Sequence, residues 1–190
     1  MFRRSSFGVV ATVAMALSIA LGAAPAAASP NVVYYQFRGW AENVRTWCVD
    51  IQAETAGNVR ANVQTYRCRA ASEQPQVQYQ AFSQEGFAGQ PDNNRRFRNK
   101  ATNKCLTYNV NGVASPGSPA NAVWAEACGQ AGQGWRHPAN QEQWEAIEYP
   151  GMCLDTVDPN GNWGTGIDVY PCNPYAQWTR WAMDFLNIPD

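Results

Sequence analysis

Six cysteines are the residues of this chain whose type and spacing say most about its chemistry. They fall into three pairs, which are Cys48 and Cys68, Cys105 and Cys128, and Cys153 and Cys172. A zinc site would require close-set ligands such as C-x-x-C, and no two of these cysteines lie that close. An even number of widely spaced cysteines is typical of disulfide bonds in an exported protein.

Other residues that carry enzymatic chemistry are sparse. His137 is the single histidine, which excludes a two-histidine metal motif such as H-E-x-x-H. The sequence contains no G-x-S-x-G nucleophile motif, and it gives no reason to place two carboxylates across a cleft for glycoside hydrolysis. We therefore expect a protein that is not an enzyme and that uses no metal or cofactor.

The cysteine pairs also mark three copies of an internal repeat of about 50 residues. The first cysteine of each pair opens a similar tetrapeptide, CVDI at Cys48, CLTY at Cys105 and CLDT at Cys153. An aromatic residue follows the second cysteine in each copy, at Tyr79, Trp135 or Trp178. Such units do not bury a core alone, so we expect three repeats, of about residues 30–86, 87–138 and 139–190, to close around one core.

Short runs of β-branched and aromatic residues, separated by Gly, Asn, Pro and Asp, predict strands throughout and no amphipathic helix. In each repeat one run precedes the first cysteine, and another, at residues 62–66, 122–126 or 166–170, leads into the second cysteine. A further run follows the aromatic residue. The pattern predicts four strands per repeat and about twelve in all.

Residues 1–28 have the pattern of a secretory signal peptide, with Arg3 and Arg4 before an apolar run and small residues at 26–28. The apolar run is short for a membrane span. We therefore expect residues 29–190 to be a single secreted, extracellular domain without a membrane span. The formal net charge of −1 gives no support to nucleic-acid binding.

With its three repeats aligned on the cysteine pairs, the chain resembles the ricin B-chain-like lectins, a family of β-trefoil domains. The third repeat is the closest, with CLD from Cys153, GIDVYPC ending at Cys172, and Gln177-Trp178. The second has Cys105-Leu106 and a complete Q-x-W in Gln133-Gly134-Trp135, and the first has Cys48-Val49-Asp50 and a drifted Val77-Gln78-Tyr79. The resemblance covers nearly all of the chain after residue 28.

The resemblance implies an all-β fold, a β-trefoil of three repeats with pseudo-threefold symmetry. Six cysteines allow fifteen pairings, and the resemblance implies the one that treats the repeats alike: Cys48–Cys68, Cys105–Cys128 and Cys153–Cys172. It also implies that Tyr79, Trp135 and Trp178 fill the shared core.

Sugar sites in this family lie within one repeat. An aspartate after the first cysteine accepts hydrogen bonds from sugar hydroxyls, and an aromatic before the second cysteine stacks on the C–H face of the ring. A polar residue two before that aromatic and an amide near Q-x-W complete the set. The resemblance implies Asp50, Gln64, Tyr66 and Gln76 in the first repeat, and Asp155, Asp168, Tyr170 and Tyr175 in the third.

The second repeat has Thr107 and Glu126 at the aspartate and aromatic places, so we expect no standard sugar site there. The function implied is a secreted, non-enzymatic lectin whose partners are glycans, either galactose-type or other hexose polymers. Two alternatives stay open. Asp50 and Asp155 could simply cap turns, and the trefoil could be a scaffold for a protein partner, as in protease inhibitors or toxin-associated modules, with vestigial sugar sites.

Overall fold

The computed structural model describes residues 32–41, 44–87, 91, 93–109, 122–137, 142–157, 164–173, 175 and 180–188. The predicted leader at residues 1–28 and Trp178 lie outside these ranges. The strands are β1 (Tyr34–Ala41), β2 (Val44–Ile51), β3 (Ala61–Arg67), β4 (Phe82–Gly86), β5 (Asn94–Asn99), β6 (Lys104–Tyr108), β7 (Val123–Ala127), β8 (Trp135–Arg136), β9 (Glu145–Ala146), β10 (Met152–Thr156), β11 (Ile167–Pro171) and β12 (Trp181–Leu186).

The described residues contain no α-helix, only the short 3-10 turns η1 (Ala53–Thr55) and η2 (Gln76–Gln80). The prediction of an all-β fold with four strands per repeat is therefore confirmed. Within the same ranges, no helix is long and apolar enough to cross a bilayer.

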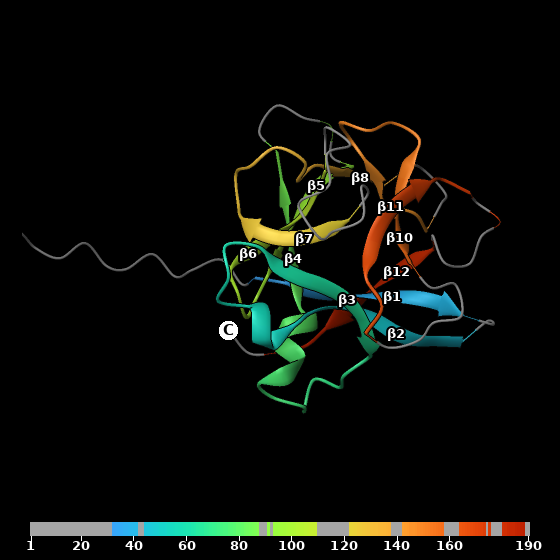
Figure 1. Cartoon of the computed structure of the whole chain (residues 1–190). Helices are drawn as coiled ribbons and strands as arrows, with labels where there is room; N and C mark the ends of the chain where they lie inside the picture. The colour runs from blue at the N-terminus through green and yellow to red at the C-terminus, as the bar shows by residue number, and fades with distance from the viewer. Residues whose placement is uncertain are drawn as a thin grey trace, which may run out of the picture. The chain divides into compact units, whose positions relative to one another are not determined.

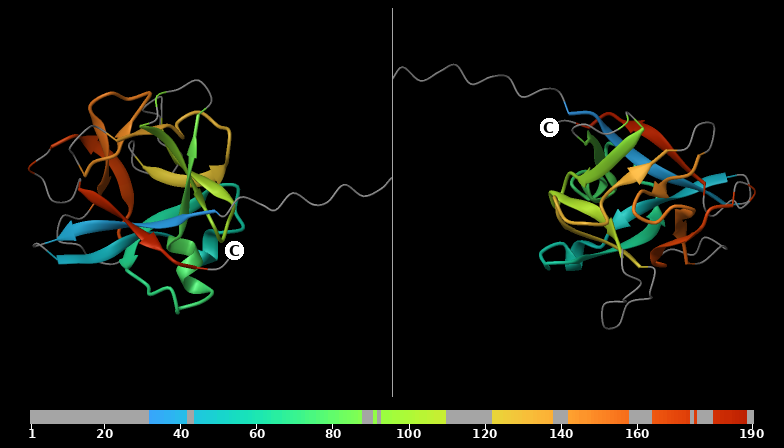
Figure 2. Two further views of the ribbon diagram at one scale, coloured as in Figure 1. Left: turned by 180° about the vertical axis from the view of Figure 1, so that it is seen from behind. Right: turned by 90° about the horizontal axis from the view of Figure 1, so that it is seen from above.

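The strands form a barrel and three hairpins, which is the β-trefoil arrangement. The first and fourth strands of the repeats pair in the order β12–β1–β4–β5–β8–β9. The second and third strands form the hairpins β2–β3, β6–β7 and β10–β11. Figure 1 shows the three repeats as three sectors, and Figure 2 shows β1 and β12 side by side from behind.

The three hairpins meet around the pseudo-threefold axis through their third strands. Strand β3 pairs with β7 at Ala61 and Ala125. Isolated bridges then join Gln64 to Gly166 and Ala122 to Asp168, so β11 also touches both neighbours. In Figure 1, β3, β7 and β11 accordingly lie around one centre. This contact brings side chains from all three repeats together.

Alternation along each strand builds the core, because successive side chains point to opposite faces. Phe37 of β1, Phe97 of β5 and Trp144 before β9 are buried and meet edge to face. Their ring centroids are 4.6 to 6.1 Å apart, within the range that favours such aromatic pairs. One aromatic from each repeat therefore closes the inside of the barrel.

The core aromatic at the Q-x-W position differs from the prediction in the first repeat, and the residue predicted in the third, Trp178, lies outside the described residues. Trp135 is fully buried as predicted, and its indole N–H donates to the carbonyl of Leu106 at 3.3 Å. In the third repeat Trp181 does the same, donating to the carbonyl of Leu154 at 2.9 Å. In the first repeat Phe82 is fully buried, whereas Tyr79 is only half-buried against the core. Placing the first-repeat core aromatic at Tyr79 was therefore wrong by three residues.

Two glutamines confirm this alignment. Gln80 bonds the main chain on both sides of Cys68, accepting from the following amide at 2.9 Å and donating to the preceding carbonyl at 2.8 Å. Gln133 holds the main chain around Cys128 in the same way, at 2.8 and 2.9 Å. The first repeat thus keeps the motif as Gln80-Ala81-Phe82, and the glutamine position is Gln80 instead of Val77.

All three predicted disulfides are present, Cys48–Cys68, Cys105–Cys128 and Cys153–Cys172. Each joins the second strand of a repeat to the end of its third strand, with Cα atoms 5.0 to 5.1 Å apart. The bonds therefore fix one end of every hairpin.

Candidate functional site

Six of the eight predicted site residues, all except Gln76 and Tyr175, lie on the faces of the first and third hairpins that point away from the core. Asp50 is directly opposite Gln64 across β2–β3, and Asp155 is opposite Asp168 across β10–β11. The neighbouring residues Val49 and Leu154 face the core. Since directly opposed side chains on one face of a hairpin are close neighbours, the two repeats present equivalent polar pairs.

In the first repeat, hydrogen bonds fix one side of the Asp50 carboxyl. The Gln64 side-chain amide donates to Asp50 Oδ1 at 3.3 Å, while Asp50 Oδ2 is buried without a partner among the described residues. Asp50 is only 5% exposed. Burial raises the pKa of Asp50, and the amides of Gln64 and Gln80 and the charge of Arg69 oppose that rise. Asp50 Oδ2 therefore keeps unused capacity to accept a hydrogen bond.

In the third repeat the polar pair consists of two carboxyls. Asp155 is 4% exposed and accepts from the Thr156 main-chain amide at 2.6 Å. Burial, with a contribution from Asp168, raises the pKa of Asp155 to about 7, and burial raises the pKa of Asp168 to about 6. Asp168 Oδ1 is buried without a partner among the described residues. Near neutral pH this pair offers both a proton donor and a charged acceptor.

Each polar pair has a tyrosine beside it on the same face. Tyr66 is opposite Cys48, and Tyr170 is opposite Cys153, two residues along the hairpin from the aspartate pair. Tyr66 is half-buried, with the Arg69 guanidinium 4.8 Å from its ring centroid. Tyr170 is 53% exposed, so its ring is open to a partner.

Gln76 and Tyr175, which complete the two predicted sets, are both exposed. Tyr175 is 92% exposed, and its main-chain amide donates to the Asn173 side chain at 3.0 Å. The described hydrogen bonds join neither residue to Asp50 or Asp155. It is Gln80 whose amide acts on the pKa of Asp50.

The second repeat differs in chemistry at the same register. Thr107 takes the aspartate position, is fully buried, and accepts a hydrogen bond from Gln133 at 2.9 Å. Trp124 is opposite Thr107, and Glu126 takes the tyrosine position. Glu126 pairs with Arg60 of the first repeat at 3.2 Å. Thr107 and Glu126 therefore have partners within the protein, and the second hairpin presents no polar pair like those of the other two.

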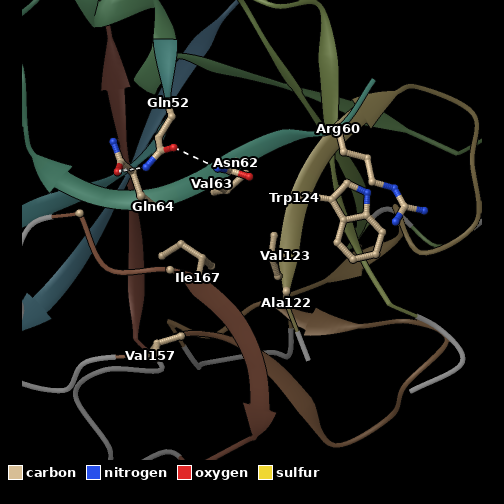
Figure 3. A pocket seen from close by; sticks show the side chains of 12 residues that line it. Gln52, Arg60, Asn62, Val63, Gln64, Ala122, Val123, Trp124, Val157 and Ile167 are labelled. Carbon is tan, nitrogen blue, oxygen red and sulfur yellow. Dashed lines mark hydrogen bonds between the residues drawn. The ribbon is translucent and has the colours of Figure 1, made fainter. Parts of the chain in front are cut away.

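The structure adds two groups that sequence reasoning missed. Gln52 links to Gln64 at 2.7 Å and extends the polar network of the first hairpin. Trp124, an ordinary strand aromatic in the sequence, borders a cavity at the pseudo-threefold axis (Figure 3). No motif marks either residue: Gln52 lies in the turn after β2, and the cavity beside Trp124 is formed by residues of different repeats. Among the residues that the structure describes, no His, Cys, Asp and Glu side chains are grouped as metal ligands.

Sequence comparison gives no relative: no protein-family model and no curated protein matches the chain. Solved structures do match. A mosquitocidal holotoxin has a TM-score of 0.64 at 18% identity, over 84% of this chain but only 18% of the toxin. The designed threefold-symmetric protein ThreeFoil has a TM-score of 0.58 at 16% identity, over 79% of this chain and 96% of its own.

Sugar-bound lectins are among the structural neighbours. The Vibrio vulnificus hemolysin/cytolysin β-trefoil lectin, with N-acetyl-D-lactosamine bound, has a TM-score of 0.56 at 16% identity, over 84% of this chain and 99% of its own. The Macrolepiota procera ricin B-like lectin, in complex with lactose, has a TM-score of 0.54 at 12% identity, over 83% and 99%. This chain therefore has the β-trefoil fold of ricin B-type lectins and toxin lectin domains.

Proposed function

We propose that this protein is a secreted, non-enzymatic lectin with sugar sites on the outer faces of the β2–β3 and β10–β11 hairpins. One observation carries the proposal: in both hairpins a buried aspartate faces a polar side chain beside a tyrosine, and each polar pair has a carboxylate oxygen without a partner among the described residues. A buried unpartnered acceptor is costly. A sugar hydroxyl would satisfy it.

In each site a carboxylate of the polar pair accepts from ring hydroxyls, since charge-assisted hydrogen bonds of this kind are strong. Gln64 and Asp168 bind a neighbouring hydroxyl. Tyr66 and Tyr170 stack on the C–H face of the ring, while Gln76 and Tyr175 border the sites. The sugar-bound structural neighbours make galactose-type sugars the first candidates.

Export agrees with this function. Three disulfides form and persist in oxidising compartments, and the pattern of residues 1–28 is that of a signal peptide. An extracellular location would give the protein access to cell-surface or matrix glycans.

A glycan array with the disulfide-bonded protein tests the proposal. The bound glycan is then titrated calorimetrically against wild type, Tyr66→Ala and Tyr170→Ala. Removal of one stacking ring should lower affinity at that site about tenfold. Tyr149→Ala, which removes a tyrosine from the β9–β10 turn outside both sites, is the matched control and should bind like wild type.

Tyrosine variants are the sharper test because Asp50 and Asp155 are buried, so alanine there would also alter the fold. Full affinity in both tyrosine variants would overturn the site assignment. Absence of any bound glycan on the array would overturn the lectin proposal itself and leave the protein-binding scaffold as the reading to pursue.

A further inference from the structure

A cavity of about 310 Å³ lies where the three hairpins meet. Its floor is built from one branched side chain per repeat, Val63, Val123 and Ile167, which follow one another around the axis in Figure 3. These residues hold equivalent places, opposite the last residues of β2, β6 and β10. No single repeat can form this cavity.

Three neutral amides border one side of the cavity. The Asn62 side chain donates to Gln52 Oε1 at 3.1 Å, and Gln52 donates to Gln64 Oε1 at 2.7 Å (Figure 3). These two hydrogen bonds hold the amides in place. An amide side chain offers two N–H donors and two acceptor lone pairs, more than these bonds use. Each amide therefore keeps hydrogen-bonding capacity for a ligand.

The indole of Trp124 borders the opposite side. The Arg60 guanidinium lies 4.5 Å from the Trp124 ring centroid, and Arg60 Nε is 3.2 Å from Glu126 Oε2. Trp124 is also the register partner of Asn62, so the ring and the amide chain lie on paired strands. The buried indole Nε1 has no partner among the described residues.

We infer that this axial cavity binds one neutral pyranose ring, as a third sugar site shared by all three repeats. The branched floor and the indole match the C–H face of a sugar, and the amides match its hydroxyls. Arg60 is the one charged residue among the described residues that line the cavity, and Glu126 compensates it. A cavity of about 310 Å³ is at the small end of ligand sites, roughly 300–1,000 Å³.

The inference rests on the proposed lectin function, and it is tested separately from the hairpin sites. Tryptophan indole signals are recorded in ¹H–¹⁵N spectra, with the Trp124 signal assigned from Trp124→Phe. The probes are the methyl glycosides of galactose, N-acetylgalactosamine, glucose, N-acetylglucosamine and mannose, with the methyl glycoside of N-acetylneuraminic acid as the charged comparator. The Trp124 signal should shift with a neutral glycoside and not with the acidic one.

Two variants change the cavity in opposite ways. Trp124→Ala removes the aromatic side and Ala122→Leu fills the space, and each should lower affinity at this site about tenfold. Val59→Ala, next to Arg60 but outside the cavity lining, is the matched control. Circular dichroism melts identify any variant that fails to fold. If Trp124→Ala does not fold, Ala122→Leu alone still tests the site.

The outcomes separate the two proposals. A Trp124 shift that survives Tyr66→Ala combined with Tyr170→Ala, and that Ala122→Leu removes, supports the axial site. Sugar binding at the hairpins without a Trp124 shift overturns the axial site alone. A Trp124 shift without any effect of the tyrosine variants overturns the hairpin assignment alone. Failure of every probe to bind overturns the axial site, and it overturns the hairpin sites as well when the glycan array also shows no binding.

Discussion

At the scale of single residues, the two proposed hairpin sites differ in the side chain that faces the aspartate. Asp50 faces the neutral Gln64, whereas Asp155 faces a second carboxyl, Asp168. Two neighbouring buried carboxyls resist ionisation together, and their proton losses are coupled. The third repeat should therefore respond to pH near neutrality much more than the first.

The pH dependence of stability tests this difference. The pKa of Asp155 is about 7 in the folded protein against an ordinary value of 3.8, so the folded state holds the proton more tightly. The free energy of unfolding must then fall as pH rises from about 4 to about 7. Asp155→Asn removes this loss of stability. At pH 8 its melting temperature should therefore exceed that of wild type, by about 2–4 °C for each 1 kcal/mol of unfolding free energy regained.

The gain of Asp155→Asn should shrink towards pH 4, where the wild-type carboxyl is protonated. Asp184→Asn is the matched control, because Asp184 forms an ion pair with Arg38 at 3.1 Å near the surface, and it should show no gain at pH 8. An Asp155→Asn protein that is less stable than wild type at pH 8 would contradict the assigned pKa.

A second prediction at this scale concerns the core tryptophan of the third repeat. Trp181 is buried and its indole bonds the Leu154 carbonyl. Trp181→Ala should lower the free energy of unfolding by about 3–5 kcal/mol, as large-to-small core changes do. Urea unfolding measures it, with Trp135→Ala expected to cost a similar amount. A loss below about 1 kcal/mol would show that Trp181 is not the equivalent of Trp135.

At the scale of elements, the second hairpin depends on close contacts behind its second cysteine. In the second repeat, Gly132 has a φ of +76° and its carbonyl accepts from the Tyr108 amide at 2.8 Å. A Cβ on Gly132 would overlap the Tyr108 carbonyl oxygen. Only glycine fits both the left-handed backbone and the close approach.

Gly132→Ala should therefore cost more stability than Gly129→Ala. Gly129 also has a positive φ, of +99°, but a Cβ there would meet nothing within 4 Å. We expect about 1 kcal/mol for Gly129→Ala from the backbone alone, and at least about twice that for Gly132→Ala because of the added overlap. Urea midpoints of the two variants, with unchanged m values, provide the measurement; equal midpoints would contradict the packing described here.

At the scale of the whole molecule, the proposed hairpin sites belong to two lobes of one rigid trefoil. One stacked ring and a few hydrogen bonds leave little affinity after ordering costs, so each site alone should be weak. Two weak sites on one body gain strongly when a glycan polymer can reach both. Multivalent ligands are therefore the expected partners.

The loss of either site should reveal this effect. Tyr170→Ala or Tyr66→Ala should lower affinity for a densely glycosylated polymer about a hundredfold, while a soluble monosaccharide still binds the remaining site unchanged. Biosensor titrations at high and low glycan density make the comparison. If each variant lost only about twofold at high density, the two sites would not act together.

Features that depend on local sequence could be predicted, and those that depend on contacts between repeats could not. The cysteine pairs and the strand runs recur within each copy, so the disulfides and the twelve strands follow from them. The drifted motif was misaligned at Tyr79 because a tyrosine and a phenylalanine three residues apart look equally suitable, and only the main-chain bonds of Gln80 distinguish them. The burial of Asp50 and Asp155 and the axial cavity arise from neighbouring segments that no single motif records.

The pairing of β1 with β12 sets the order in which this protein can be completed. Tyr34 is opposite Leu186, so the barrel closes only when the last strand has joined the first. Contacts between such distant residues carry a large loop-closure cost and are made slowly. A chain emerging from the ribosome therefore cannot finish its barrel early. The barrel would therefore stay open until β12 has been synthesised, and the hairpins would form before it closes.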